Sequence, residues 1–77
     1  MNTNLWVRSQ DRKKLVKCEA FYIFNNNDGT FSILDDNTDF VLGTYKTEKD
    51  AIKILDYIYN LICNTIQDIM YNMPENK

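Results

Sequence analysis

The sequence predicts an α+β fold in which a four-stranded antiparallel meander is followed by one long C-terminal amphipathic helix. In the first half of the chain, short apolar or alternating runs are separated by reversals rich in Asn, Asp and Gly. A parallel crossover needs about a dozen residues or more, so these short reversals favour antiparallel pairing. After Lys46 the apolar residues recur in steps of three and four, which is typical of a helix.

The first two strands are expected at Leu5–Arg8 and Leu15–Phe24, with the polar segment Ser9–Lys14 turning the chain between them. The second strand has one continuously apolar face, which we expect to point to the core: Val16, Cys18, Ala20, Tyr22 and Phe24.

Asn25–Gly29 reads NNNDG, and its residues tolerate the positive φ that a hairpin reversal needs. Thr30–Leu34 is expected as the third strand and Phe40–Tyr45 as the fourth. Asp35–Asp39 reads DDNTD and should form a turn between them, because its side chains can hydrogen-bond their own backbone.

The helix is expected to begin at the cap residue Thr47, with Asp50 three residues later in a capping-box-like arrangement. It should end near Asn72, because Pro74 disfavours helical geometry at the preceding residue. Its apolar stripe comprises Ile52, Leu55, Tyr59, Ile62, Ile66, Ile69 and Met73.

A helix of about 25 residues spans roughly 37 Å, whereas strands of five or six residues span about 17 to 20 Å. Such a helix outruns its sheet, and we expect it to pair with a second copy as a dimer or larger oligomer. The expected interface residues are Ile54, Ile58, Leu61, Ile62, Ile66 and Ile69. The alternative is a curved sheet that wraps the helix.

Seventy-seven residues without an interior composition break predict a single domain, 1–77, with an ordered core of about 5–73. The chain has no histidine and only two cysteines, Cys18 and Cys63, which we interpret as small buried hydrophobes; no metal, cofactor or disulfide is expected. No signal peptide or membrane span is recognisable, which predicts a cytoplasmic protein.

The spacing of Asp35, Asn37 and Asp39 is that of the first ligands of a calcium-binding loop, but Phe40 occupies the position at which such a loop needs glycine. We therefore expect a plain turn. The carboxylates Asp35, Asp36 and Asp39 are expected to be solvated in this turn, without the burial that acid or base catalysis needs and without an electrophilic partner, so we expect no enzyme activity.

The candidate site is the basic segment after the first strand. Arg8 and Arg12 can form charge-assisted hydrogen bonds with phosphate. Gln10 can hydrogen-bond to the polar edge of a ligand. An aromatic ring, that of Trp6, Tyr22 or Tyr45, can stack on a base. The full set of expected ligand-binding residues is Trp6, Arg8, Ser9, Gln10, Asp11, Arg12 and Tyr45. The alternative is a solvated turn in which Asp11 pairs with Arg8 or Arg12.

Leu5–Asp11 reads LWVRSQD and Leu42–Asp56 reads LGTYKTEKDAIKILD. This pair of segments resembles the hallmark pattern of a family of small proteins carried by phages, prophages and mobile elements of low-GC Gram-positive bacteria. Arg12 stands where lysine is usual there, and Thr44 where glutamate is usual. The matching residues are Trp6, Arg8, Ser9, Gln10, Asp11, Leu42, Gly43, Tyr45, Thr47, Ala51, Leu55 and Asp56.

The resemblance implies a phage or mobile-element accessory protein without enzyme activity. The chain is also similar in kind to viral sponge proteins that sequester cyclic nucleotides or cyclic ADP-ribose signals in host defence. Our first hypothesis is therefore a homo-oligomeric, cytoplasmic nucleotide sponge. Two alternatives stay open: a module that inhibits a host or rival enzyme by docking on it, and a regulator that binds nucleic acid. Duplex binding is disfavoured, because the rest of the chain is acidic.

Overall fold

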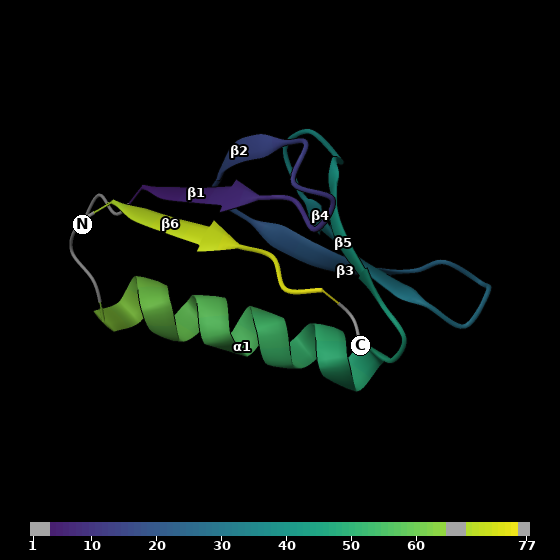
Figure 1. Ribbon diagram of the computed structural model, residues 1–77. Coiled ribbons are helices and arrows are strands. Elements are labelled where there is room, and N and C mark those ends of the chain that lie inside the picture. The colour runs from purple at the N-terminus through teal and green to yellow at the C-terminus, as the bar shows by residue number, and fades with distance from the viewer. Residues whose placement is uncertain (1–3, 65–67, 76–77) are drawn as a thin grey trace.

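The computed structural model describes residues 4–64 and 68–75. These ranges form six strands and one helix, in the order β1 (Leu5–Arg8), β2 (Leu15–Cys18), β3 (Phe21–Asn25), β4 (Phe31–Asp35), β5 (Val41–Tyr45), α1 (Glu48–Asn64) and β6 (Ile69–Asn72). The strands make two three-stranded sheets (Figure 1): sheet A has the order β2-β1-β6 and sheet B the order β3-β4-β5. The predicted four-stranded meander is therefore wrong. The strands lie in two sheets, the expected second strand is two strands, and a strand follows the helix.

Sheet A places the first and last strands of the chain side by side. β1 is its central strand and pairs antiparallel with β2, with Leu5 opposite Cys18. On its other side it pairs parallel with β6, with Leu5 opposite Ile69. A parallel pair needs a long connection, and here that connection contains sheet B and α1. The Met73 amide closes the pairing by donating to the Arg8 carbonyl at 3.0 Å.

The predicted strand Leu15–Phe24 is interrupted at Glu19 and Ala20, so β2 joins sheet A and β3 joins sheet B. The interruption reverses which alternate residues face inward. Phe21 and Ile23 pack against the core. Of the face expected to be buried, Val16 and Cys18 do pack in the core, but Ala20 is exposed, Tyr22 is only half-buried and Phe24 is half exposed.

Sheet B confirms the two predicted reversals. In the turn between β3 and β4, Asn27 and Gly29 have φ of 67° and 91°, which is the left-handed conformation that Asn and Gly tolerate best. In the turn between β4 and β5, the Asp35 carboxylate accepts hydrogen bonds from the Thr38 hydroxyl at 2.7 Å and the Thr38 amide at 3.2 Å. Asp39 in the same turn has φ of 60°.

The helix begins as predicted, because the Thr47 hydroxyl accepts a hydrogen bond from the Asp50 amide at 3.1 Å. It ends at Asn64, well before the predicted end near Asn72. Its buried residues are Ala51 and Ile58. The predicted stripe is therefore only partly buried: its member Leu55 packs against the core, whereas Ile52 and Tyr59 are exposed.

The residues expected at a subunit interface have several different environments within one chain. Ile58 is buried in the core, and Ile54 and Ile69 pack against that core, the latter from β6 rather than from a helix. Leu61 is half-buried and Ile62 is 37% exposed. Ile66 lies outside the described residues. Of the predicted interface set, Ile54, Ile58 and Ile69 are thus used by the core of the chain itself.

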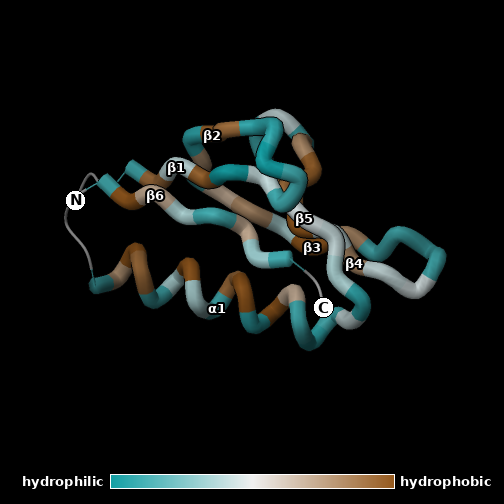
Figure 2. The backbone as a smooth tube through the Cα atoms, in the orientation of Figure 1, coloured by the Kyte–Doolittle hydropathy of each residue, from teal (hydrophilic) through white to brown (hydrophobic). Residues whose placement is uncertain are grey.

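The core lies where the two sheets and α1 meet, and it consists of Leu5, Val7, Cys18, Ile33, Leu42, Tyr45, Ala51, Ile58 and Met73. The rings of Tyr57 on α1 and Tyr71 on β6 are 5.5 Å apart between centroids, which links the helix to sheet A. Figure 2 shows apolar residues recurring along α1 and a polar end on the β3–β4 hairpin. In the described part of the chain no helix has the length and apolar character needed to cross a membrane.

Candidate functional site

The side of sheet A that faces away from the core carries an exposed mixture of apolar and basic side chains. Leu5 and Val7 on β1 point inward and are buried, so alternation directs Trp6 and Arg8 outward. The registers place further residues beside them in two rows. We call this set the outer face of sheet A; its rows are Lys17, Trp6 and Met70, and Leu15, Arg8 and Asn72.

The outer face is accessible and has no acidic member. Trp6 is 37% exposed in the central strand, and Leu15 and Met70 at its margins are 48% and 64% exposed. Neighbouring strands lie about 4.8 Å apart and the two rows about 6.6 Å apart. An indole ring and a guanidinium group are therefore adjacent on an open surface, in reach of one ligand.

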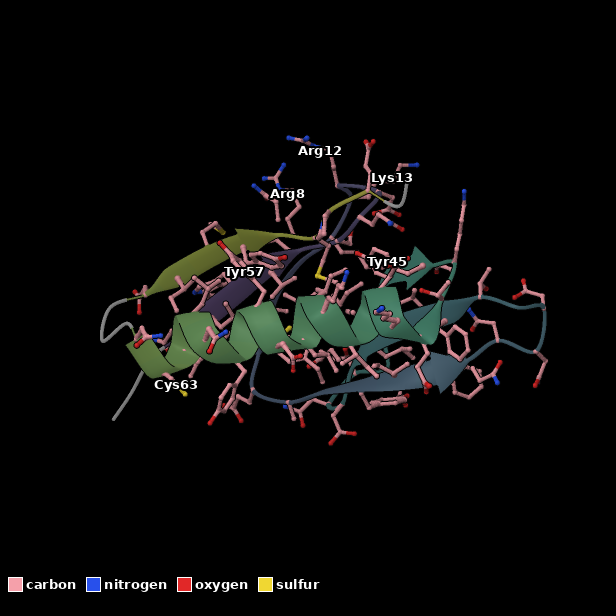
Figure 3. The ribbon with its side chains drawn as sticks, turned by 90° about the horizontal axis from the view of Figure 1, so that it is seen from below. Arg8, Arg12, Lys13, Tyr45, Tyr57 and Cys63 are labelled. Atoms are coloured by element: carbon pink, nitrogen blue, oxygen red, sulfur yellow. The ribbon has the colours of Figure 1, made fainter. Side chains whose placement is uncertain are left out.

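The turn after β1 adds further positive charge. Figure 3 shows Arg8, Arg12 and Lys13 projecting from the same side of the molecule. The Lys14 ammonium group instead lies 5.6 Å from the centroid of the Phe40 ring, a cation–π distance. Between Leu5 and Cys18 the chain has five basic residues and one acidic residue, net +4, whereas the rest has four basic and ten acidic residues, net −6.

The backbone of this turn is already satisfied by the chain. The Ser9 amide donates to the Lys14 carbonyl at 2.9 Å, and the Arg12 amide to the Ser9 carbonyl at 2.8 Å. The Ser9 hydroxyl accepts from the Lys14 amide and donates to the Asp11 carboxylate, which also accepts from the Lys13 amide. The pKa of Asp11 is lowered mainly by the hydrogen bond from the Ser9 hydroxyl and, to a smaller extent, by the one from the Lys13 amide. Ser9 and Asp11 thus shape the turn, and anion binding there depends on the basic side chains.

Gln10 joins the two sheets. Its amide donates to the Leu42 carbonyl, and its side-chain oxygen accepts from the Thr44 amide at 3.0 Å. Its side-chain nitrogen donates to the carbonyls of Thr44 at 3.2 Å and Pro74 at 3.1 Å. The Gln10 side chain therefore pairs with β5 much as a neighbouring strand would, and it also fixes the segment after β6.

Tyr45 is part of the core rather than of a surface site. It is 2% exposed, and its hydroxyl donates to the Pro74 carbonyl at 2.9 Å. The pKa of Tyr45 is raised mainly by burial and, to a smaller extent, by the neighbouring Tyr71. In Figure 3 its ring lies inside the molecule, away from Arg8 and Arg12.

Of the seven predicted ligand residues, Trp6 and Arg12 are exposed, and Arg8 is half-buried on the outer face. Ser9, Gln10, Asp11 and Tyr45 make contacts within the fold. The prediction missed four residues that stand beside Trp6 and Arg8 on the outer face: Leu15, Lys17, Met70 and Asn72. Alternation in the predicted second strand could have pointed to Leu15 and Lys17, whereas Met70 and Asn72 were assigned to the helix.

Replacing Gln10 by Ala should lower the free energy of unfolding by about 1–3 kcal/mol, because it leaves partly buried backbone groups of β5 without partners. Urea denaturation followed by circular dichroism measures this loss. The control is Asn60→Ala, an exposed amide on α1, which should change stability by less than about 0.5 kcal/mol. Equal stability of the Gln10 variant and the wild type would contradict the structural role.

The two cysteines and the acidic turn offer no better site. Cys18 is buried as predicted. The pKa of its thiol is raised to about 12, mainly by this burial and, to a smaller extent, by the charge of Asp35. Cys63 is exposed, so the prediction that it is buried is wrong. Asp35 is buried with one carboxylate oxygen unpaired and the other bound to Thr38. Within the described ranges, no group of three metal-ligating side chains occurs.

No family model, curated protein or solved structure matches this chain. The site is therefore interpreted from its own side chains. The outer face of sheet A, with the basic turn beside it, is the one area described here in which an accessible aromatic ring, an arginine and further cations lie together.

Proposed function

We propose that the protein is a non-enzymatic nucleotide-binding protein that holds its ligand on the outer face of sheet A. The observation that carries this proposal is the adjacency of Trp6 and Arg8 on the exposed side of the central strand. An indole ring stacks on a base, and a guanidinium group forms charge-assisted hydrogen bonds with phosphate. Two further positive charges lie nearby: Lys17 is beside Trp6 on the outer face, and Arg12 projects from the turn on the same side of the molecule as Arg8.

The resemblance to phage and mobile-element proteins supplies a biological role for such binding. A protein that binds a nucleotide signal without turnover acts by sequestering it, and this would make the chain an accessory protein in counter-defence within the host cytoplasm. In this proposal Ser9, Gln10, Asp11 and Tyr45 stabilise the fold that presents Trp6 and Arg8. They do not contact the ligand.

Calorimetric titration tests the proposal with a panel of cyclic dinucleotides, ADP-ribose isomers and short oligonucleotides. We expect a ligand of this chemistry to bind, and Trp6→Ala to weaken binding by about 1–3 kcal/mol through loss of stacking. Arg8→Ala should also weaken it through loss of a charge-assisted contact. Tyr59→Ala and Lys53→Ala, exposed on α1, are the matched aromatic and basic controls. If no member of the panel binds the wild type, the proposal is wrong.

Docking on another protein is the second candidate, favoured by the exposed Leu15 and Met70 on either side of the central strand. Trp, Met and Arg are enriched in protein interfaces, and a buried Trp often contributes much of the binding energy. The net charge of this region selects a partner with an acidic surface. Such a partner would bury Leu15 and Met70, whereas a single stacked base would leave at least one of them in water.

The homo-oligomer predicted from the helix also remains a proposal. With Ile58 in the core, the large apolar side chains that α1 leaves exposed for it are Ile52, Tyr57, Tyr59 and Ile62. Light scattering at micromolar concentration would give at least twice the chain mass for an oligomer and the chain mass for a monomer.

A further inference from the structure

The outer face of sheet A is open, which restricts the kind of nucleotide that it suits. Sites for small molecules are concave and bury most of the ligand surface. Here the described elements that pack on sheet A do so from its inner side: Tyr57 of α1 contacts Tyr71, and the core cluster joins Leu5 and Val7 to sheet B. A free nucleotide lying on Trp6 would keep much of its surface in water.

The positive charge is spread along the chain direction of β1 instead of being gathered at one point. Lys17 lies beside Trp6, Arg8 lies one row further along, and Arg12 and Lys13 follow in the turn. Figure 3 shows Arg8, Arg12 and Lys13 directed to the same side. Cations spread in this way can contact the successive phosphates of a nucleic acid chain.

Duplex nucleic acid does not fit these features. Trp6 can stack only on a base whose face is exposed, and the bases inside a duplex are covered by their neighbours. The remainder of the protein carries a net charge of −6, which repels a long and dense polyanion. A flexible single strand can follow the basic residues and leave the acidic surface in solvent.

We infer that the ligand of the outer face is a short segment of single-stranded nucleic acid, with one base stacked on Trp6 and successive phosphates on Arg8, Arg12 and Lys13. This inference rests on the proposed nucleotide-binding function and selects one ligand class within it. Recognition of this kind tolerates different base sequences, because every base offers a ring face.

The protein contains a single tryptophan, so its intrinsic fluorescence reports on the proposed stacking position directly. Titration with thymidine monophosphate, a dinucleotide, a tetranucleotide and an octanucleotide should quench Trp6 with affinity that rises along the series. The logarithm of the binding constant should fall with the logarithm of the salt concentration, by about 0.7 for each phosphate contact.

Arg12→Gly is the variant that tests the phosphate contacts. Arg12 has φ of 67°, a conformation that glycine adopts freely, so the variant removes a charge without straining the turn. It should reduce the salt slope by about 0.7 and leave the quenching intact. Lys53→Ala, an equal charge change on α1, should leave the slope unchanged.

The outcomes separate the inference from the function on which it rests. Equal affinity for the monophosphate and the octanucleotide, with quenching, overturns the single-strand inference but supports the proposed function. Tighter binding of a duplex of the same length also overturns the inference. If no nucleotide binds or quenches Trp6, both proposals fail. Binding of polyglutamate in that case would mean that the face recognises acidic surfaces in general.

Discussion

Replacing Ile58 by Ala should lower the free energy of unfolding by about 2–5 kcal/mol, whereas Ile52→Ala on the same helix should change it by less than about 1 kcal/mol. Ile58 is 2% exposed and belongs to the core to which both sheets and α1 contribute, while Ile52 is 44% exposed. Truncating the buried side chain loses its transfer free energy and leaves a cavity. Truncating the exposed one loses little of either.

This pair tests which face of α1 is buried. The two variants have the same chemistry and the same change in helix propensity, so the difference between their urea midpoints reports burial alone. A larger loss at Ile52 than at Ile58 would mean that the helix packs in the phase predicted from the sequence. Because a small domain has only about 5 kcal/mol of stability to lose, Ile58→Val, expected to cost about 0.5–1.5 kcal/mol, keeps the comparison measurable if Ile58→Ala does not fold.

The elements that the sequence predicts well are those with local causes. Asn27 and Gly29 have positive φ where the hairpin reverses, and Thr47 caps the helix, because these residues act on backbone atoms a few positions away. The end of the helix was predicted wrongly because Ile62, Ile66, Ile69 and Met73 continue in steps of three and four. Spacing alone could not show that Ile69 begins a strand, since its partner, Leu5, lies at the other end of the chain.

In the candidate site too, features with a local cause were predictable and those that depend on distant residues were not. Trp6 and Arg8 were recognisable from residue type and from alternation within one short strand. The role of Gln10 was not, because its partner Thr44 is 34 positions away in another sheet. Met70 and Asn72 reach the outer face only through the parallel pairing of β6 with β1, for which a single sequence carries no local signal.

Gly43→Ala should lower the free energy of unfolding by about 1–3 kcal/mol through overpacking. A Cβ atom at Gly43 would lie 2.6 Å from the Tyr45 hydroxyl oxygen, and 2.9 and 3.0 Å from the ring atoms Cε2 and Cζ. The ring cannot simply move away, because it is buried and its hydroxyl is bound to the Pro74 carbonyl. Relieving the clash therefore requires a shift of β5, of the segment after β6, or of both. Thermal or urea unfolding measures the loss.

A double-mutant cycle identifies the cause. Leu at position 45 lacks the outer ring atoms that a Cβ at Gly43 would meet, so Gly43→Ala should cost little in a Tyr45→Leu background. The chain's other glycine gives a contrast: Gly29 has open space around it but φ of 91°, so Gly29→Ala strains the backbone, and Tyr45→Leu should not relieve that cost. If Gly43→Ala were equally costly with Tyr45 and with Leu at that position, the clash with the ring would not be the reason for glycine there. If the cost disappears, the LGTY segment has a structural explanation: glycine makes room for the tyrosine ring that joins β5 to the end of the chain.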